Sequence, residues 1–320
     1  MREAVFVRNN KEAWQQFEKL TGRRNIDPDE LSDLYLKITD DLSFAKTHYP
    51  NSRTHQYLNN IASKVYLSIY RNKKEKSSRF ITFWKYELPL VYYRNRKNLL
   101  VSFLIFVVSM AIGALSVLND ETFARVILGD GYVNMTLENI KNEDPMAVYK
   151  GGGEVFFFLA ITVNNIKVSF AAFALGIFLS IGSGWVLFKN GVMVGVFQLF
   201  FLKYGLLQES FLTIWIHGTL EISAIVIAGG AGITMGNSIL FPGTYPLGHS
   251  LLKGAKNGVK MVIGLVPVFI TAGFLEGFVT RHYQTHWAIN LTIIILSAIF
   301  IVYYFIIYPR KIYHDGVSKN

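Results

Sequence analysis

The chain has 320 residues, of which 51% are hydrophobic and 17% are charged, and its formal net charge is +10. Charged residues make up about a quarter of a typical soluble protein, so the composition indicates a membrane protein. The chain has no cysteine, which excludes disulfide bonds, thiolate nucleophiles and cysteine-ligated zinc sites.

The first third of the chain is its most charged part. Residues 1–98 carry 19 Lys/Arg and 11 Asp/Glu, against 13 and 11 in the rest. Apolar residues recur there at helical spacing, so we expect an N-terminal helical domain over residues 1–97. Its predicted helices lie near residues 10–21, 28–47 and 53–73. No apolar leader opens the sequence, so the N-terminus is expected in the cytoplasm.

A basic, aromatic stretch precedes the first apolar segment. Ten Lys/Arg and two acids lie between Lys64 and Lys97. Basic residues beside a span favour the cytoplasmic side, and they suit contact with anionic membrane lipids. Nucleic acid is the rival partner for these charges, but the adjacent span favours lipid. We therefore expect lipid contact and no nucleic-acid binding.

Six apolar stretches approach the length of about 20 residues that a helix needs to cross a bilayer. They lie near residues 99–118, 166–188, 191–207, 211–233, 257–279 and 287–308. Six crossings return the C-terminus to the cytoplasm, with Lys189, Lys256 and Arg310 on the same side. We expect an all-α, polytopic membrane helix bundle over residues 98–320.

Residues 119–163 are predicted to be extracytoplasmic. Seven acids and three basic residues lie in residues 119–154. The chain is then apolar from Val155 to Phe188, which is too long for one upright crossing. We place a break at Asn164-Asn165, with residues 154–163 as an aromatic helix at the membrane interface. One long tilted helix is the alternative, and a hairpin at Asn190-Gly191 is a further possibility.

Ionisable residues inside apolar spans are rare and need a reason beyond packing. His217 and Glu221 lie four residues apart, on one helix face, where they can hydrogen-bond. Glu276 lies near the outer end of the fifth span. We predict an intramembrane polar cluster in the outer half of the bilayer. Its members are Asn164, Asn165, Lys167, Lys203, His217, Glu221 and Glu276.

Structural roles compete with functional ones at these positions. His217 and Glu221 can be a pair that fixes helix register, and Lys167 and Lys203 can reach the lipid headgroups. One His with one Glu cannot alone form the usual three- or four-ligand metal site, so we expect no metal and no cofactor. The HExxH, GxSxG and GxxxxGK[ST] motifs are absent. We therefore expect no catalytic residues and no enzyme activity.

Small residues four apart predict close helix packing around the cluster and make a homodimer plausible. The predicted packing residues are Ala172, Gly176, Ser180, Gly184, Gly191, Gly195, Ala224, Ala228, Gly232, Gly273 and Gly277.

Several motifs occur in a distinctive order. They are Trp14, Asp40-Asp41-Leu42, Asn164-Asn165, Asn190-Gly191 and His217-Gly218-x-x-Glu221. In order and spacing they resemble the stage II sporulation protein M family of bacterial integral membrane proteins. The resemblance implies a non-enzymatic, multi-pass scaffold of the inner membrane, with envelope proteins such as peptidoglycan hydrolases as partners. The alternative is a channel or transporter for ions, protons or a small polar solute that uses the His217–Glu221 pair.

Overall fold

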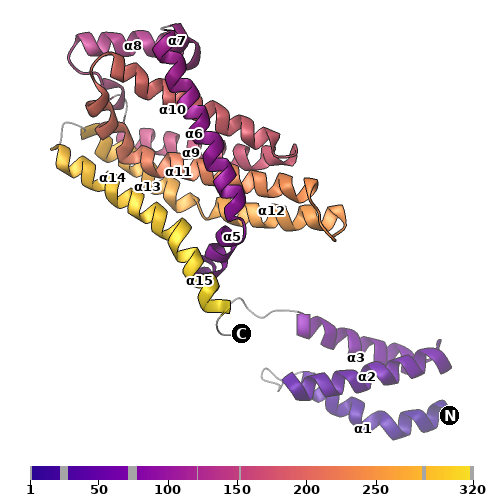
Figure 1. Cartoon of the computed structure of the whole chain (residues 1–320). Coiled ribbons are helices and arrows are strands. Elements are labelled where there is room, and N and C mark those ends of the chain that lie inside the picture. Colours follow the sequence, from indigo (N-terminus) through magenta and orange to yellow (C-terminus); the bar gives the residue numbers. More distant parts are fainter. Residues whose placement is uncertain are drawn as a thin grey trace. The chain divides into compact units, whose positions relative to one another are not determined.

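The computed structural model describes residues 2–21, 28–70, 78–120, 122–150, 153–282 and 286–317. These residues are mostly helical and include no strand, which confirms the predicted all-α class (Figure 1). The chain divides into two compact units, Met1–Phe80 and Ile81–Asn320. The basic run at residues 71–76, part of the predicted stretch before the first span, lies outside the described residues.

The N-terminal unit contains the three predicted helices. They are α1 (Glu3–Thr21), α2 (Pro28–His48) and α3 (Arg53–Tyr70). Their apolar faces share a small core, because each sequence repeats apolar residues at helical spacing. Trp14 and Phe17 from α1 are buried against Ile38 of α2 and Leu58 of α3. The Trp14 Nε1 atom donates a hydrogen bond to Asp41 Oδ2 at 2.7 Å, so the indole is anchored to α2.

The second unit is called the membrane unit below, and its described residues include six helices long and apolar enough to cross a membrane. The first span is α6 (Arg96–Asn119), and the second is α9 (Glu154–Ala174) followed by η3 (Leu175–Ile177). The third is α10 (Ile181–Lys203) and the fourth is α11 (Leu207–Leu240). The fifth consists of α12 (Leu247–Ile263), α13 (Val266–Phe274), η4 (Leu275–Val279) and η5 (Thr280–His282), and the sixth consists of α14 (Trp287–Val302), η6 (Tyr303–Ile307) and α15 (Tyr308–Val317). The predicted number of spans is confirmed. The chain is a multi-pass membrane protein.

The boundary between the second and third spans differs from the prediction. Helix α9 runs without interruption through Asn164 and Asn165. The prediction of a separate interface helix at residues 154–163 is therefore wrong, and the alternative of one continuous helix through this region is the one observed. The chain turns instead at Leu179 and Ser180, both with positive φ, and α10 then continues through Asn190. Neither asparagine pair ends a helix: Asn165 is buried in the bundle, and Asn190 Nδ2 donates to the Val186 carbonyl oxygen of its own helix.

Residues between the first two spans form a folded element that we call the cap. It comprises α7 (Thr122–Leu128), α8 (Asp130–Lys141) and η2 (Ala147–Lys150), beside the end of α6 in Figure 1. Val133 and Met146 of the cap are buried against Val196 and Phe200 of α10. We call this end of the membrane unit the cap end.

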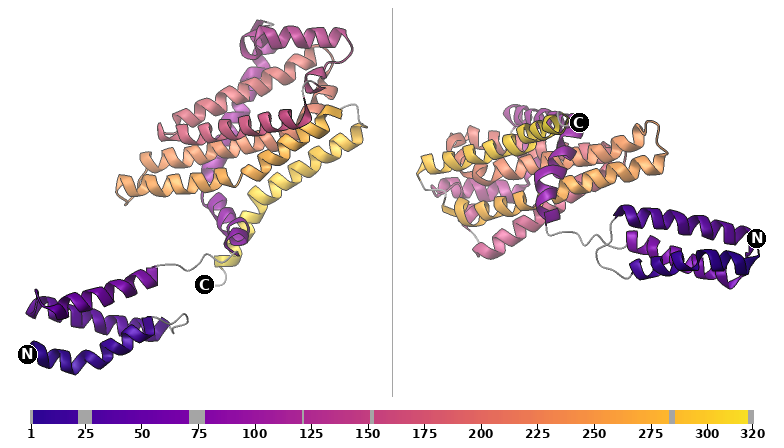
Figure 2. Two further views of the ribbon diagram at one scale, coloured as in Figure 1. Left: turned by 180° about the vertical axis from the view of Figure 1, so that it is seen from behind. Right: turned by 90° about the horizontal axis from the view of Figure 1, so that it is seen from below.

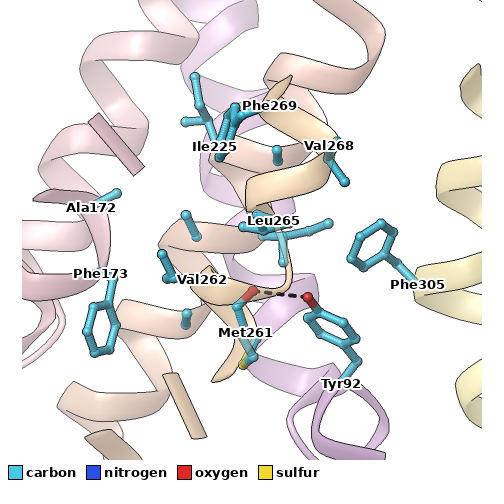
Figure 3. Packing of buried hydrophobic residues seen from close by; sticks show 14 of the residues in the cluster. Tyr92, Ala172, Phe173, Ile225, Met261, Val262, Leu265, Val268, Phe269 and Phe305 are labelled. Atoms are coloured by element: carbon cyan, nitrogen blue, oxygen red, sulfur yellow. Dashed lines mark hydrogen bonds between the residues drawn. The ribbon is translucent and has the colours of Figure 1, made fainter. Parts of the chain in front are cut away.

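Helix α11 is the most buried of the spans, and α14 is the least. Figure 2 shows α14, in yellow, at one side of the bundle. The main core lies around α11, with Ile225 close to Leu265 and Phe269 of the neighbouring span (Figure 3). Close van der Waals packing of these large apolar side chains helps to hold the spans in register.

From Ile81 onward, the stretch before the first span belongs to the membrane unit. It forms α4 (Ser78–Thr82), η1 (Phe83–Glu87) and α5 (Leu88–Arg94). The Tyr92 hydroxyl donates to the Met261 carbonyl oxygen at 3.1 Å, as Figure 3 shows. Glu87 forms an ion pair with Lys260. These contacts dock the stretch onto the bundle, so it is more than a surface-bound helix.

Several predicted packing residues lie at close helix contacts. A Cβ atom at Gly176 would collide with the carbonyl oxygen of Gly232, and one at Gly191 would lie 2.7 Å from the Phe106 carbonyl oxygen. Ala224 is fully buried. Gly184, in contrast, has open space around it. The η3–α11 and α6–α10 contacts therefore depend on positions without a side chain.

Candidate functional site

Three ionisable side chains from two spans converge inside the bundle, toward the cap end. His217 and Glu221 come from α11, and Glu276 comes from η4. One nitrogen or carboxylate oxygen from each lies within 4.8 Å of the others. His217 is 5% exposed and Glu276 is 9% exposed, while Glu221 is half-buried. We call these three residues the His-Glu-Glu cluster.

Local backbone geometry aims these side chains at one another. Residues four apart on α11 lie one above the other, which stacks His217 and Glu221. Glu276 lies in the π-helical turn η4, which re-aims side chains and often occurs at functional sites. A Cβ at Gly277 would lie 3.0 Å from the Phe158 Cβ, so this glycine lets α9 approach beside Glu276.

Hydrogen bonds orient the cluster. The Nδ1 atom of His217 shares a hydrogen bond of 3.0 Å with Thr280 Oγ1, while Nε2 lies 3.8 Å from Glu276 Oε1. The second distance is an ion-pair approach, too long for a hydrogen bond. Glu221 accepts a hydrogen bond from the Asn165 side chain. Among the bonds of the described residues there is none between His217 and Glu221, which the spacing alone had allowed.

The cap supplies a residue that sequence reasoning missed. The Tyr149 ring lies 5.7 Å, centroid to centroid, from the imidazole of His217. Burial raises the pKa of the Tyr149 phenol well above its usual value, and the nearby Glu276 and Glu221 carboxylates raise it further. The phenol therefore stays protonated at neutral pH. No periodic pattern marked Tyr149, because it lies in the short 3₁₀ turn η2.

A hydrogen bond ties the cap to the span that carries Glu276. Arg281 Nη2 donates to the carbonyl oxygen of Lys150 at 2.6 Å. Lys150 Nζ in turn lies 2.7 Å from Asp144 Oδ2. Tyr149 is therefore held beside the cluster by the residue that follows it. Thr280 was also missed, although its position four residues after Glu276 could have suggested it.

The structure brings together four of the seven predicted cluster residues. Asn165 is 6% exposed and joins the His-Glu-Glu cluster, whereas Asn164, Lys167 and Lys203 are exposed. Lys203 lies near Asp120, whose pKa is lowered chiefly by hydrogen bonds from Thr122 and slightly by this lysine. Because both lysines are exposed, they do not neutralise the cluster carboxylates.

The chemistry of the cluster follows from its burial. Two carboxylates this close inside a low-dielectric bundle are costly as bare anions, so a proton or a cation must share the site. One imidazole with two carboxylates also makes three possible metal ligands. The expectation of no metal rested on a pair of donors, and Glu276 adds the third. The arrangement can relay protons or hold a cation.

A second buried polar group lies toward the other end of the spans. Asn98 Nδ2 donates to Thr234 Oγ1 at 3.1 Å, and Asn237 Nδ2 donates to Asn98 Oδ1 at 2.9 Å. Ser102 Oγ donates to the Val226 carbonyl at 2.6 Å. These side chains are uncharged and join α6 to α11. Their geometry is that of a structural lock between two helices.

Comparison with known proteins bears on both units. A family model described as "Stage II sporulation protein M" matches residues 102–281, and one described as a domain of unknown function (DUF8413) matches residues 4–71. The uncharacterized protein MJ0706 of Methanocaldococcus jannaschii is 26% identical over 191 residues, which cover 58% of this chain and 83% of that protein. No solved structure matches significantly. The first match spans more than half of the chain and includes the whole His-Glu-Glu cluster.

Proposed function

Because this chain belongs to the stage II sporulation protein M family, we propose that it is a non-enzymatic scaffold that holds cell-envelope proteins together at a bacterial cytoplasmic membrane. The family is not a known enzyme family. In this proposal both termini lie in the cytoplasm and the cap faces outward. The charge pattern supports that orientation: Arg96 and Lys97 begin the first span, and acids dominate residues 119–154.

The observation that carries the proposal is the folded cap. A scaffold needs a surface of fixed shape, and the cap has its own buried residues against α10 and a hydrogen bond to Arg281. Its solvent side mixes apolar and acidic groups: Val126 is 74% exposed and Met135 is 38% exposed, with Glu138 exposed nearby and Asp130 exposed but paired with Arg125. Such a patch suits a protein partner with a basic rim.

Site-specific photocrosslinking tests the scaffold. A photoreactive residue at Val126 or Met135 should trap an envelope protein in living cells, whereas one at Tyr245, in the loop at the other end of the spans, should not trap the same protein. The trapped species is identified by mass and assayed for peptidoglycan hydrolysis. Cap positions that trap nothing, or the same species as Tyr245, would contradict the proposal.

A transporter is the second candidate, because the His-Glu-Glu cluster places ionisable groups inside the spans. The broken helix at Leu265, between α12 and α13, adds to that case. Proton or cation flux into liposomes should then exceed that of empty liposomes and fall in Glu221→Gln. Background flux for the wild type and the variant alike would remove the transporter and leave the scaffold.

A further inference from the structure

We propose that His217, Glu221 and Glu276 bind one divalent transition-metal cation, and that zinc(II) is the ion the donor set fits best. Imidazole nitrogen with carboxylate oxygen is a common ligand combination for zinc. Three protein ligands leave a fourth position for water, as in open zinc sites. The inference goes beyond the scaffold and does not depend on it.

The donor atoms are close to the spacing that one ion requires. Zinc binds nitrogen and oxygen at about 2.0–2.2 Å, so two donors on one tetrahedral ion lie roughly 3.4 Å apart. His217 Nε2 and Glu276 Oε1 are 3.8 Å apart, and the donors of all three residues lie within 4.8 Å of one another. A movement of about an ångström by the oxygens of the two carboxylates would bring all three donors to the spacing that one zinc ion requires.

Charge also favours a divalent cation. Two carboxylates inside an apolar bundle need positive charge, and an ion of charge +2 neutralises both at once. Lys167 and Lys203, which the sequence predicted as members of the cluster, are exposed. Arg281 follows Thr280, but its Nη2 is directed to the Lys150 carbonyl oxygen.

Outer hydrogen bonds hold the ligands as they do at known metal sites. A metal-binding histidine usually gives its second ring nitrogen to a neighbouring polar group, which fixes the ring. Thr280 Oγ1 takes this position at Nδ1 of His217, and that leaves Nε2 for the cation. The Asn165 amide holds the Glu221 carboxylate, and the Tyr149 ring lies beside the imidazole. A bound ion would therefore fasten α11 to η4 directly beneath the cap.

Zinc binding to the untagged full chain in nanodiscs tests the proposal. After chelator treatment and dialysis, ZnCl2 is titrated by calorimetry and bound metal is counted by mass spectrometry. We expect one zinc per chain. His217→Gln and Glu276→Gln should each weaken binding by more than about 100-fold, and Thr280→Val by about 10- to 100-fold, as for loss of an outer-shell partner. Glu154→Gln, an exposed carboxylate at the start of α9, is the matched control and should bind as the wild type does.

The outcomes separate a built site from adventitious binding. No saturable zinc binding, the same affinity in Glu276→Gln as in the wild type, or binding of MgCl2 but not ZnCl2 would overturn the proposal. If the ligand variants fail to fold, cobalt(II) in the wild type decides, because a tetrahedral site with imidazole and carboxylate ligands gives an intense visible spectrum that octahedral hydrated cobalt lacks. None of these results bears on crosslinking from the cap, so the two proposals fail independently.

Discussion

At the scale of single residues, Thr280 holds the imidazole of His217 in place. Its Oγ1 lies 3.0 Å from the ring nitrogen, and both side chains are buried. A buried polar group that loses its partner costs about 1–3 kcal/mol. We therefore expect Thr280→Val, which keeps the shape and removes the hydroxyl, to lower the free energy of unfolding by about that amount.

Thr271→Val is the matched control for this prediction. Thr271 is exposed on α13 and its hydroxyl donates only to the Pro267 carbonyl of its own helix. The control should change stability by less than about 0.5 kcal/mol. Both variants are compared by denaturant unfolding in mild detergent, without added metal. Equal losses for the two would show that the His217–Thr280 bond contributes nothing.

The sequence indicated the ionisable residues of this site, but it could not show which of them lie close together. His217 and Glu221 stand out because charge in an apolar helix is rare. That Glu276 lies within reach of both depends on how two spans pack, which no local pattern records. Lys167 and Lys203 are exposed, which fits the alternative in which a long aliphatic stem lets lysine reach the headgroups.

At the scale of elements, Gly176 sets the distance between η3 and α11. A Cβ atom there would meet the Gly232 backbone, which cannot move aside as a flexible side chain can. Gly176→Ala should therefore lower the melting temperature in detergent, by the equivalent of about 1–3 kcal/mol. Gly184→Ala on α10 meets no atom and should be neutral or slightly stabilising, since alanine favours helix. Equal effects would contradict close packing at Gly176.

The cap should lose stability at high pH. Burial raises the pKa of Tyr132 to about 12, against an ordinary value of 10.0. Below pH 10 the phenol is neutral in folded and unfolded chains alike, so the stability of the cap does not depend on its titration. Between pH 10 and 12 the unfolded chain releases the proton and the folded chain keeps it, so stability falls.

Phenolate absorbance, followed as the pH of the folded protein is raised, measures this directly. Tyr132→Phe should remove one late-titrating phenol from the titration curve of the folded protein. A late group unchanged in Tyr132→Phe would contradict the burial of Tyr132 in the cap.

The sequence predicted which segments form helices, but it did not predict the break between the second and third spans. Apolar length gave the six spans, and apolar spacing gave the three N-terminal helices. The turn at Leu179 and Ser180 carries no proline or glycine of its own, and its one local signal is that serine favours a helix N-cap. The Asn164-Asn165 pair suggested a helix break, yet Asn165 is a buried helical residue whose side chain donates a hydrogen bond to Glu221.

At the scale of the whole molecule, the distribution of charge leads to a proposed orientation. The chain has no cysteine, so single cysteines can be introduced without background. Met135→Cys lies on the exposed side of the cap, and Lys256→Cys lies on α12, on the opposite side of the membrane in the proposed topology. We expect a membrane-impermeant maleimide to label Met135→Cys in intact spheroplasts and Lys256→Cys only after permeabilisation. Ser43→Cys, exposed in the N-terminal unit, should behave as Lys256→Cys does. The reverse pattern would place the cap in the cytoplasm and leave it no envelope partner to hold.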